Sequence, residues 1–365
     1  KIFPSWDCLP YDRISPNSEI SSDRLSLLTD LAQNLSSKLI ILTTVNAVTQ
    51  RIPNRSVLSS ATFKAEAGKN IDINQLYSFL SKMGFSKTST VSEPGDYAVR
   101  GGIIDIFAPG ELGAVRLDLF GDVLDGIRQF DPISQRTVSK MSNIRLAPVS
   151  EVIFEEASIS RFRQNYRKAF GASHSKDNLY ESVSAGTKYQ GVEHWLPFFH
   201  DKLETIFDYL ADATVTLDDN IEATRTSRWE VIIDQFQSRK ENLEQKNRLD
   251  TVYKPIEPEQ LYLNENDWKF ALSSRTVLQF SPFPQTPGPN IKDAGGMIGK
   301  NFSIERQMEN MNIFNSLASY IKSEMETRPV IIASYTDGAR ERLRGLLKDE
   351  GLNGANLIQN ISQVD

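Results

Sequence analysis

The sequence predicts an α/β protein in which a small α+β domain, containing an antiparallel meander, interrupts a larger α/β domain. Three observations support this prediction. Helical and buried-strand patterns alternate over residues 1–61, short strands with tight turns follow over residues 99–130, and helical patterns return after Pro148. Because the chain has 365 residues, more than one ordinary core is expected, which means two or three domains.

The composition is that of an ordinary globular protein, with 39% hydrophobic and 24% charged residues. The net charge of −6 argues against a general nucleic-acid surface, which would carry a basic stripe. The single cysteine, Cys8, excludes a disulfide framework and a cysteine-rich zinc site, and fits a reducing cytoplasm. The histidines have no metal-ligand spacing, and no apolar run approaches the roughly 18 residues of a membrane span. We therefore expect a cytoplasmic protein that holds no metal and does not act at a membrane.

Residues 1–61 predict part of an α/β layer. A helix is expected over residues 19–35, where leucines recur at helical spacing. Residues 38–45 (KLIILTTV) form a continuous apolar run, which is typical of a buried parallel strand. A further short helix is expected over residues 46–51. The chain opens on IFPSWDCLPYD, which resembles the interior of a domain, so we expect a piece of a longer chain.

Residues 62–148 predict a separate inserted domain. A strand over residues 63–67 precedes a helix that begins at Asp72 and ends at Gly84. Ten Lys or Arg balance ten Asp or Glu in this segment, which favours a patterned protein surface as its partner over a polyanion. Proline, glycine and aspartate turns then separate the three expected strands of the meander, over residues 103–107, 115–120 and 123–130.

The second strand of the meander carries the most information. Side chains alternate along a strand, so Arg116, Asp118 and Phe120 share one face while two leucines point to the other. If the charged face is in water, Phe120 next to Arg116 has the composition of an interface hot spot. The alternative is that another part of the chain covers Phe120 and that Arg116 only pairs with a nearby aspartate.

Residues 149–280 return to the larger domain. A helix with a basic outer side is expected over residues 159–170, and the aromatic segment 193–199 (EHWLPFF) is interpreted as core. A buried strand over residues 213–217 and a long polar helix over residues 221–247 follow.

Residues 281–302 are predicted to be a linker, because their first part is dense in proline and glycine. Residues 303–365 then predict the start of a further, incomplete α/β domain. Its expected elements are a helix over residues 304–325, a strand over residues 329–334 and a helix over residues 337–347.

Catalytic motifs are missing from the sequence. The best match to a phosphate-binding loop, at residues 294–301 (AGGMIGKN), lacks the first glycine and the Ser or Thr that meets magnesium, so it is interpreted as a loop. Asp218 and Asp219 follow a predicted strand, where a magnesium-binding acid would lie, but no phosphate loop accompanies them. They are interpreted as a vestigial acid site or a helix cap. We therefore assign no catalytic residue, cofactor or metal to this chain.

Four segments resemble the amino-terminal UvrB-like region of the bacterial transcription-repair coupling factors, the Mfd family: FPSWDCLPYDRISPNSEISSDRLSLL, EPGDYAVRGGIIDIFAPGE, VRLDLFGDVLDGIRQFDPISQRT and GVEHWLPFF. The resemblance covers nearly the whole chain, more loosely after about residue 200. It implies a degenerate nucleotide-hydrolase-like (RecA/UvrB-like) α/β domain, truncated at its start, over residues 1–61 and 149–280. The insertion at 62–148 would be the UvrA-binding domain.

The resemblance also implies a function. Members of this family displace stalled RNA polymerase with an ATP-driven DNA translocase and recruit the damage-recognition ATPase UvrA. The family's UvrA contact falls on Arg100, Arg116 and Phe120 here, with Asp118 and Arg128 as weaker candidates. ATP, magnesium, RNA polymerase and duplex DNA are implied only for parts of the full-length relatives outside this chain, which we expect to be monomeric. A distant carboxyl-terminal domain masks the UvrA contact in resting relatives, so this chain is expected to bind UvrA constitutively.

Two other functions agree less well with the sequence. A UvrB-type excision-repair helicase would carry a working phosphate loop and a tyrosine-rich hairpin that grips damaged DNA. The segment FPSWDCLPYDRISPNSEISSDRL is short and lacks that aromatic insertion, which favours the coupling factors. A general DNA-binding scaffold is disfavoured by the net charge of −6, and a steep salt dependence on undamaged duplex would be needed to support it.

Overall fold

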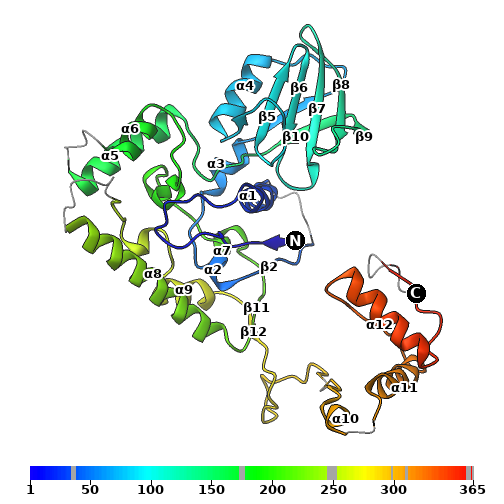
Figure 1. The fold of residues 1–365 in the computed structure, drawn as a ribbon. Helices are drawn as coiled ribbons and strands as arrows, with labels where there is room; N and C mark the ends of the chain where they lie inside the picture. The colour runs from blue at the N-terminus through cyan, green and yellow to red at the C-terminus, as the bar shows by residue number, and fades with distance from the viewer. Residues whose placement is uncertain are drawn as a thin grey trace. The chain divides into compact units, whose positions relative to one another are not determined.

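The computed structural model describes residues 1–33, 38–171, 177–244, 253–296, 299–308, 311–358 and 363. They form a mixed α/β fold that divides into two compact units, Lys1–Phe283 and Pro284–Asp365 (Figure 1). The boundary between the units falls inside the segment 281–302. Within the described part of the chain, no helix is both long and apolar enough to span a membrane.

The larger domain of the first unit is built around helix α1 (Ser18–Ala32). This helix begins at Asn17, whose side-chain oxygen accepts a hydrogen bond from the backbone N–H of Glu19. Leu25 and Leu28 of α1 are completely buried, as their helical spacing predicts. The other helices of this domain are α2 (Val45–Val48), α3 (Arg55–Ser60), α5 (Glu156–Phe170), α6 (Asn178–Ser184), α7 (Ile206–Tyr209), α8 (Ile221–Glu244) and α9 (Glu265–Ser273), with the 3-10 turns η2 (Val192–Phe198) and η3 (Pro258–Gln260).

The expected buried strand over residues 38–45 is wrong in length and burial. Only β2 (Leu42–Thr43) forms, and it pairs in parallel with β1 (Ile2–Phe3). Among the described residues this pair is covered on one face only. Leu39 and Ile41 therefore pack against the core, whereas the alternate side chains are exposed, Ile40 by 79%.

The second short pair of strands repeats this pattern. β11 (Val215–Leu217) lies parallel to β12 (Val277–Gln279), and only Leu217 of β11 is buried. The expected strand over residues 213–217 therefore forms only over 215–217, and its expected burial is wrong because one face of this two-stranded pair is exposed. The aromatic segment 193–199 is core, as predicted, and its rings pack with those of α5.

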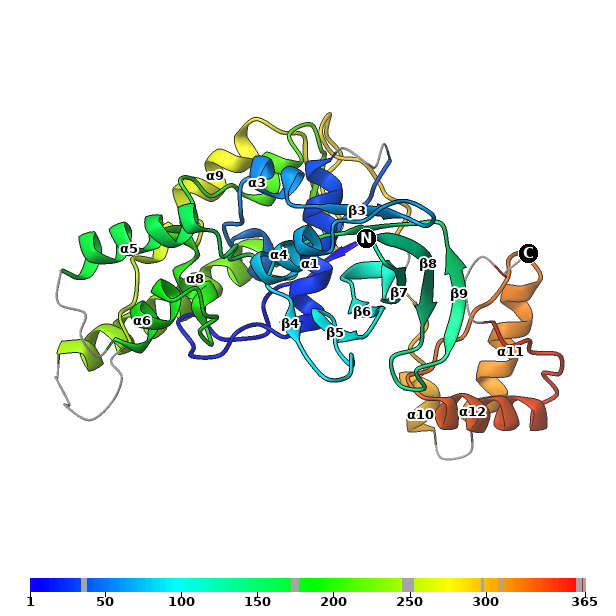
Figure 2. The ribbon, with the colours of Figure 1, turned by 90° about the horizontal axis from the view of Figure 1, so that it is seen from above.

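The inserted domain is dominated by one antiparallel sheet, which begins with one parallel pair (Figures 1 and 2). The meander is confirmed, and strands that the sequence had not indicated extend it on both sides. The strands run in chain order: β4 (Ser86–Lys87), β5 (Asp96–Arg100), β6 (Ile103–Phe107), β7 (Ala114–Phe120), β8 (Val123–Phe130) and β9 (Thr137–Met141), with the turn η1 (Gly110–Leu112) between β6 and β7.

Helix α4 (Ile73–Lys82) covers one face of this sheet. It begins at Asp72, whose carboxylate caps the backbone N–H of Gln75, and Gly84 follows its end with a φ of +90°, as predicted. Apolar residues of α4 and of the inner face of the sheet form one core. β3 (Phe63–Glu66), paired with β10 (Asn143–Leu146), packs against the same core. The opposite face of the sheet does not pack against α4.

Contacts with α1 hold the inserted domain on the larger domain. Arg145 of β10 forms an ion pair with Asp30 and donates a hydrogen bond to the side chain of Gln33 at 3.0 Å. Gly110 lies so close to α1 that a Cβ there would be 2.3 Å from the hydroxyl oxygen of Ser26. The inserted domain is therefore fixed to a helix of the larger domain at β10 and at the turn between β6 and β7.

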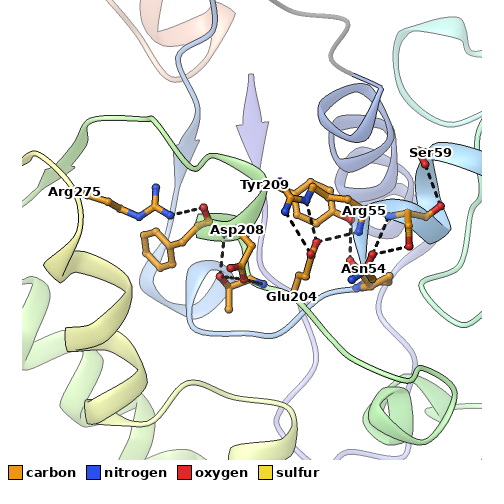
Figure 3. A network of polar contacts seen from close by, with 11 residues as sticks. Asn54, Arg55, Ser59, Glu204, Asp208, Tyr209 and Arg275 are labelled. Atoms are coloured by element: carbon orange, nitrogen blue, oxygen red, sulfur yellow. Dashed lines mark hydrogen bonds and ion pairs between the residues drawn. The ribbon is translucent and has the colours of Figure 1, made fainter.

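A polar network also anchors the segment that leads into the inserted domain (Figure 3). The carboxylate of Glu204 accepts the backbone N–H of Arg55 at 3.0 Å and pairs with its guanidinium at 3.2 Å. The hydroxyl of Tyr209 donates to the carbonyl oxygen of Pro53 at 2.8 Å. Arg275 donates to the carbonyl oxygen of Phe207 in α7 and to those of the two residues that follow the helix. The bonds from Arg55 to Glu204 and from Tyr209 to Pro53 therefore hold the segment before the inserted domain in place within the larger domain.

A buried ion pair lies where the chain leaves the inserted domain. The Nε of Arg24, in α1, is 2.7 Å from Oε1 of Glu151, and neither side chain has appreciable contact with solvent. The indole N–H of Trp6 donates to the same oxygen at 3.1 Å, and Arg24 donates to the carbonyl of Pro4. Each charge therefore has a partner inside the core.

The second unit is helical in its described part. Its small core consists of Ala318, Ile321 and Leu347. The expected strand over residues 329–334 is wrong, because the described residues of this unit contain no strand. The expected helix over residues 304–325 is instead two helices. The helices are α10 (Ser303–Gln307), α11 (Ile313–Met325) and α12 (Asp337–Asp349).

Candidate protein interface on the meander sheet

The register of the sheet places charged residues in one row. Asp105 of β6 lies opposite Arg116 of β7, which lies opposite Arg128 of β8, which lies opposite Lys140 of β9. Residues directly opposite one another project from the same face of a sheet, so this row faces away from α4.

The next row of the same face adds further charged residues. Arg100 of β5 lies opposite Ile103, which lies opposite Asp118 of β7. Phe120 follows two residues after Asp118, at the end of β7, and therefore shares this face. We call this surface the outer face and define it as Arg100, Asp105, Arg116, Asp118, Phe120, Arg128 and Lys140.

Asp105 joins two of the predicted arginines. Its carboxylate is completely buried and accepts two hydrogen bonds from Arg116, at 2.6 Å from Nε and 2.9 Å from Nη2. Arg100 donates to the same carboxylate through Nη2 at 2.5 Å. The hydrogen bonds to Asp105 raise the pKa of Arg116, so this guanidinium is always charged.

Two neighbours enclose Arg116 further. Its guanidinium lies 4.7 Å from the ring centroid of Phe130, which is a cation–π distance. Its Nη2 also donates to the side-chain oxygen of Gln135 at 3.4 Å. The side-chain amide of Gln135 in turn donates to the carbonyl oxygens of Val91 and Pro132. Arg116 is thus held from several sides and retains 16% of its side-chain exposure.

Asp118 and Arg128 form a second pair on the outer face. Arg128 donates to both carboxylate oxygens of Asp118, at 2.8 Å from Nε and 2.6 Å from Nη2. Both side chains keep about a quarter to a third of their exposure. The geometry is bidentate, so the pair has a defined orientation on the sheet.

Phe120 is the large apolar residue that β7 presents on this surface. It is 82% exposed, immediately before the turn at Gly121, so no described part of the chain covers it. The alternative of intramolecular packing is therefore wrong for Phe120. For Arg116 the alternative is correct in its geometry, because this arginine does pair with an aspartate, Asp105. Arg100 keeps 49% of its side-chain exposure.

The structure brings the predicted residues Arg100, Arg116, Phe120, Asp118 and Arg128 together on one face. Sequence reasoning missed Asp105. A signal was present, because Asp105 is the one charge within the apolar strand IIDIF and alternation places it away from the core. The missing information was the register across the β6–β7 turn, which decides whether Asp105 lies opposite Arg116.

The predicted acid pair forms a turn rather than a cluster. The carboxylate of Asp218 accepts the backbone N–H of Asp219 at 2.9 Å, just before α8. Across the described ranges, no group of three or more His, Cys, Asp or Glu side chains is arranged to hold a metal ion. The loop at residues 294–301 has no regular structure where it is described, and residues 297–298 lie outside the described ranges.

Comparison with known proteins adds to this geometry. A family model described as the UvrB interaction domain matches residues 63–152, which contain the whole outer face. The transcription-repair-coupling factor of Haemophilus influenzae is 31% identical over 366 residues, covering 100% of this chain and 31% of that protein. The chain is a relative of the transcription-repair-coupling factors.

Further coupling factors agree with this assignment. The coupling factor of Rickettsia typhi is 29% identical over 347 residues, with 95% of this chain and 30% of that protein covered. The coupling factor of Escherichia coli is 29% identical over 346 residues, with 94% of this chain and 29% of that protein covered. The chain therefore spans about a third of the length of the curated coupling factors it matches.

Proposed function

We propose that this chain recruits UvrA through the outer face of its meander sheet, and so links transcription to nucleotide excision repair. The observation that carries the proposal is the 82% exposure of Phe120 within the segment matched by the UvrB interaction domain. Exposed aromatic residues next to arginines are the usual composition of an interface hot spot.

The outer face also indicates the chemistry of its partner. Phe120 requires an apolar pocket, because covering its ring is the main gain in free energy that the exposed residues can offer. Four cationic side chains of the outer face stand against two carboxylates, so a partner with acidic groups around that pocket would complement it. Such charges set orientation and association rate more than affinity.

The other activities of the coupling factors are assigned to parts of those proteins outside this chain. We propose that ATP and magnesium serve the translocase there, and that RNA polymerase and duplex DNA bind there. The chain itself is proposed to have no ATPase activity and to act as a monomer in the bacterial cytoplasm, where transcription and repair meet. We propose that the residues of this chain are sufficient to bind UvrA constitutively.

Binding to purified UvrA tests the proposal. The chain is immobilised, and association and dissociation rates are measured by biolayer interferometry between about 50 and 300 mM salt, a roughly sixfold range over which screening increases. We expect saturable binding, an association rate that falls with salt, and competition by UvrB. A full-length resting coupling factor should bind more weakly than this chain. Absence of binding would refute the proposal, and ATP hydrolysis by the purified chain would favour the UvrB-type helicase instead.

A further inference from the structure

The arginines of the outer face differ in what they can offer a partner. An arginine has five N–H donors. Arg116 uses three of them within the chain, two toward Asp105 and one toward Gln135. This leaves only the N–H groups of Nη1, which the described residues do not engage. Arg116 therefore cannot present its bidentate edge to a partner carboxylate while it is bound to Asp105.

Arg100 is in the opposite situation. It makes one described hydrogen bond, from Nη2 to Asp105, and half of its side chain is exposed. It also lies at the same end of the sheet as Phe120. The backbone N–H of Leu119 donates to the carbonyl of Gly102 at 2.7 Å, so the turn that follows Arg100 lies directly beside the end of β7.

Asp105 is the group that both arginines share. It is buried among apolar residues of the outer face, where Ala98 lies opposite it and Phe130 lies under Arg116. A buried carboxylate in such surroundings is stable only when it is fully paired. The two hydrogen bonds from Arg116 fix the position of the Asp105 carboxylate. The single hydrogen bond from Arg100 is therefore made to an acceptor whose position is already fixed.

We infer that Asp105 is a positioning residue for partner recognition: Arg116 fixes Asp105, Asp105 orients Arg100, and Arg100 with Phe120 makes the contact. This inference rests on the proposed function and specifies which residues of the outer face touch UvrA. Holding Arg100 beside Phe120 in the free protein reduces the rotamer entropy that binding would otherwise cost. Arg116 therefore acts on Asp105 and Asp105 acts on Arg100, so Arg116 affects binding without touching the partner.

A double-mutant cycle tests this order. The dissociation constant for UvrA is measured for the wild type, Asp105→Asn, Arg116→Gln and the double variant, with folding checked by circular dichroism and heat-induced unfolding. We expect each single variant to bind at least about tenfold more weakly, and the double variant to be no weaker than Arg116→Gln within about threefold. Asp118→Asn is the matched control on the same face, and its effect should multiply with that of Arg116→Gln.

A second cycle keeps the inference testable if Asp105→Asn does not fold. In the wild-type background, Arg116→Gln should weaken UvrA binding. In the Arg100→Gln background, the same substitution should change the dissociation constant by less than about threefold, because Arg116 acts through Arg100. An undiminished effect of Arg116→Gln in either cycle would overturn the inference and place Arg116 in direct contact with UvrA. Wild-type affinity in Asp105→Asn would also overturn it.

A measurement without UvrA separates this inference from the proposed function. In ¹⁵N-labelled protein, the Nε–H of Arg116 should give a signal that exchanges slowly with solvent, and Asp105→Asn should abolish that signal while the backbone amide spectrum of the sheet is retained. If the wild type fails to bind UvrA, the proposed function fails and the role in recognition fails with it. If the wild type binds but the cycles are additive, only the positioning role fails.

Discussion

Replacing Phe120 by alanine should weaken UvrA binding without weakening the fold. A phenylalanine covers about 150–250 Å² when it is buried, and 82% of the Phe120 surface is still available for that. At about 25 cal/mol per Å², covering it contributes about 3–5 kcal/mol, of which alanine would retain a small part. We therefore expect Phe120→Ala to cost about 2–4 kcal/mol of binding free energy, which is a dissociation constant raised about 30-fold or more.

The chain offers a closely matched control. Phe270, in α9 of the larger domain, is 81% exposed and lies outside the segment matched by the UvrB interaction domain. Phe270→Ala removes the same side chain at the same exposure, so it should leave the affinity for UvrA unchanged. Both variants should unfold within about 0.5 kcal/mol of the wild type, because neither ring is packed in the core.

The assay is titration calorimetry of each variant with UvrA, with urea unfolding measured in parallel. Equal affinity of the wild type and Phe120→Ala would refute the reasoning, since the exposed ring would then contribute nothing to binding. An equal loss in Phe270→Ala would refute it differently, by showing that any exposed aromatic ring supports binding. A loss of affinity accompanied by an equal loss of folding stability would assign Phe120 to the fold.

Three further predictions concern stability. Glu151→Ala leaves Arg24 buried without its carboxylate and should lower the free energy of unfolding by about 3–5 kcal/mol in urea titrations; loss of less than about 1 kcal/mol would contradict this. Burial lowers the pKa of His194 from 6.5 to about 4, so the unfolded chain binds more protons between these values, and stability should fall by about 2 kcal/mol from pH 7 to pH 5. That decrease should be smaller in His194→Asn. Gly191→Ala, with a φ of +79° and a backbone carbonyl carbon 2.9 Å from the new Cβ, should lower the melting temperature more than Gly171→Ala, where φ is +86° and the space is open.

The meander could be predicted because its signals are local. Turn residues, strand lengths and alternation are all present between Ile103 and Phe130, and they give three strands and the faces of their side chains. The partners of those strands are not local. β5 and β9 were missed because their pairing depends on register with strands that are already in the sheet, and β9 is exposed along nearly its whole length, which removes the apolar signal.

The prediction of buried parallel strands was wrong for the opposite reason, because its signal was local but burial is not. The apolar run at residues 38–45 has the composition of a buried strand, but composition reports what a segment could bury and not what lies on top of it. In the described structure one face of the β1–β2 pair packs on the core and the other is open, so Ile40 and Leu42 are exposed. The segment 329–334 has the same apolar composition and forms no strand in the described residues.

At the candidate site too, the local sequence pattern does not show which residues of other strands lie nearby. Alternation placed Arg116, Asp118 and Phe120 on one face, and this followed from β7 alone. It could not show that Arg116 is already engaged, because the acceptor is Asp105 on another strand. The sequence therefore predicts which residues form the surface, whereas the structure is needed to divide them into residues that contact a partner and residues that hold the others in place.

The charged pairs around Phe120 also explain how so exposed a ring can be tolerated before a partner binds. A large exposed apolar patch on a sheet favours aggregation, and edge strands favour pairing with other chains. Here Phe120 lies at the end of β7 with the partly exposed Val123 opposite it, and much of the outer face is occupied by the Asp105–Arg116 and Asp118–Arg128 pairs. Within each pair the opposite charges neutralise each other, so these side chains are already paired before a partner binds. The turn at Gly110, between β6 and β7, packs against Ser26 of α1, so the sheet is held on the larger domain and presents the Phe120 ring from a fixed surface, which is the property that a recruiting surface requires.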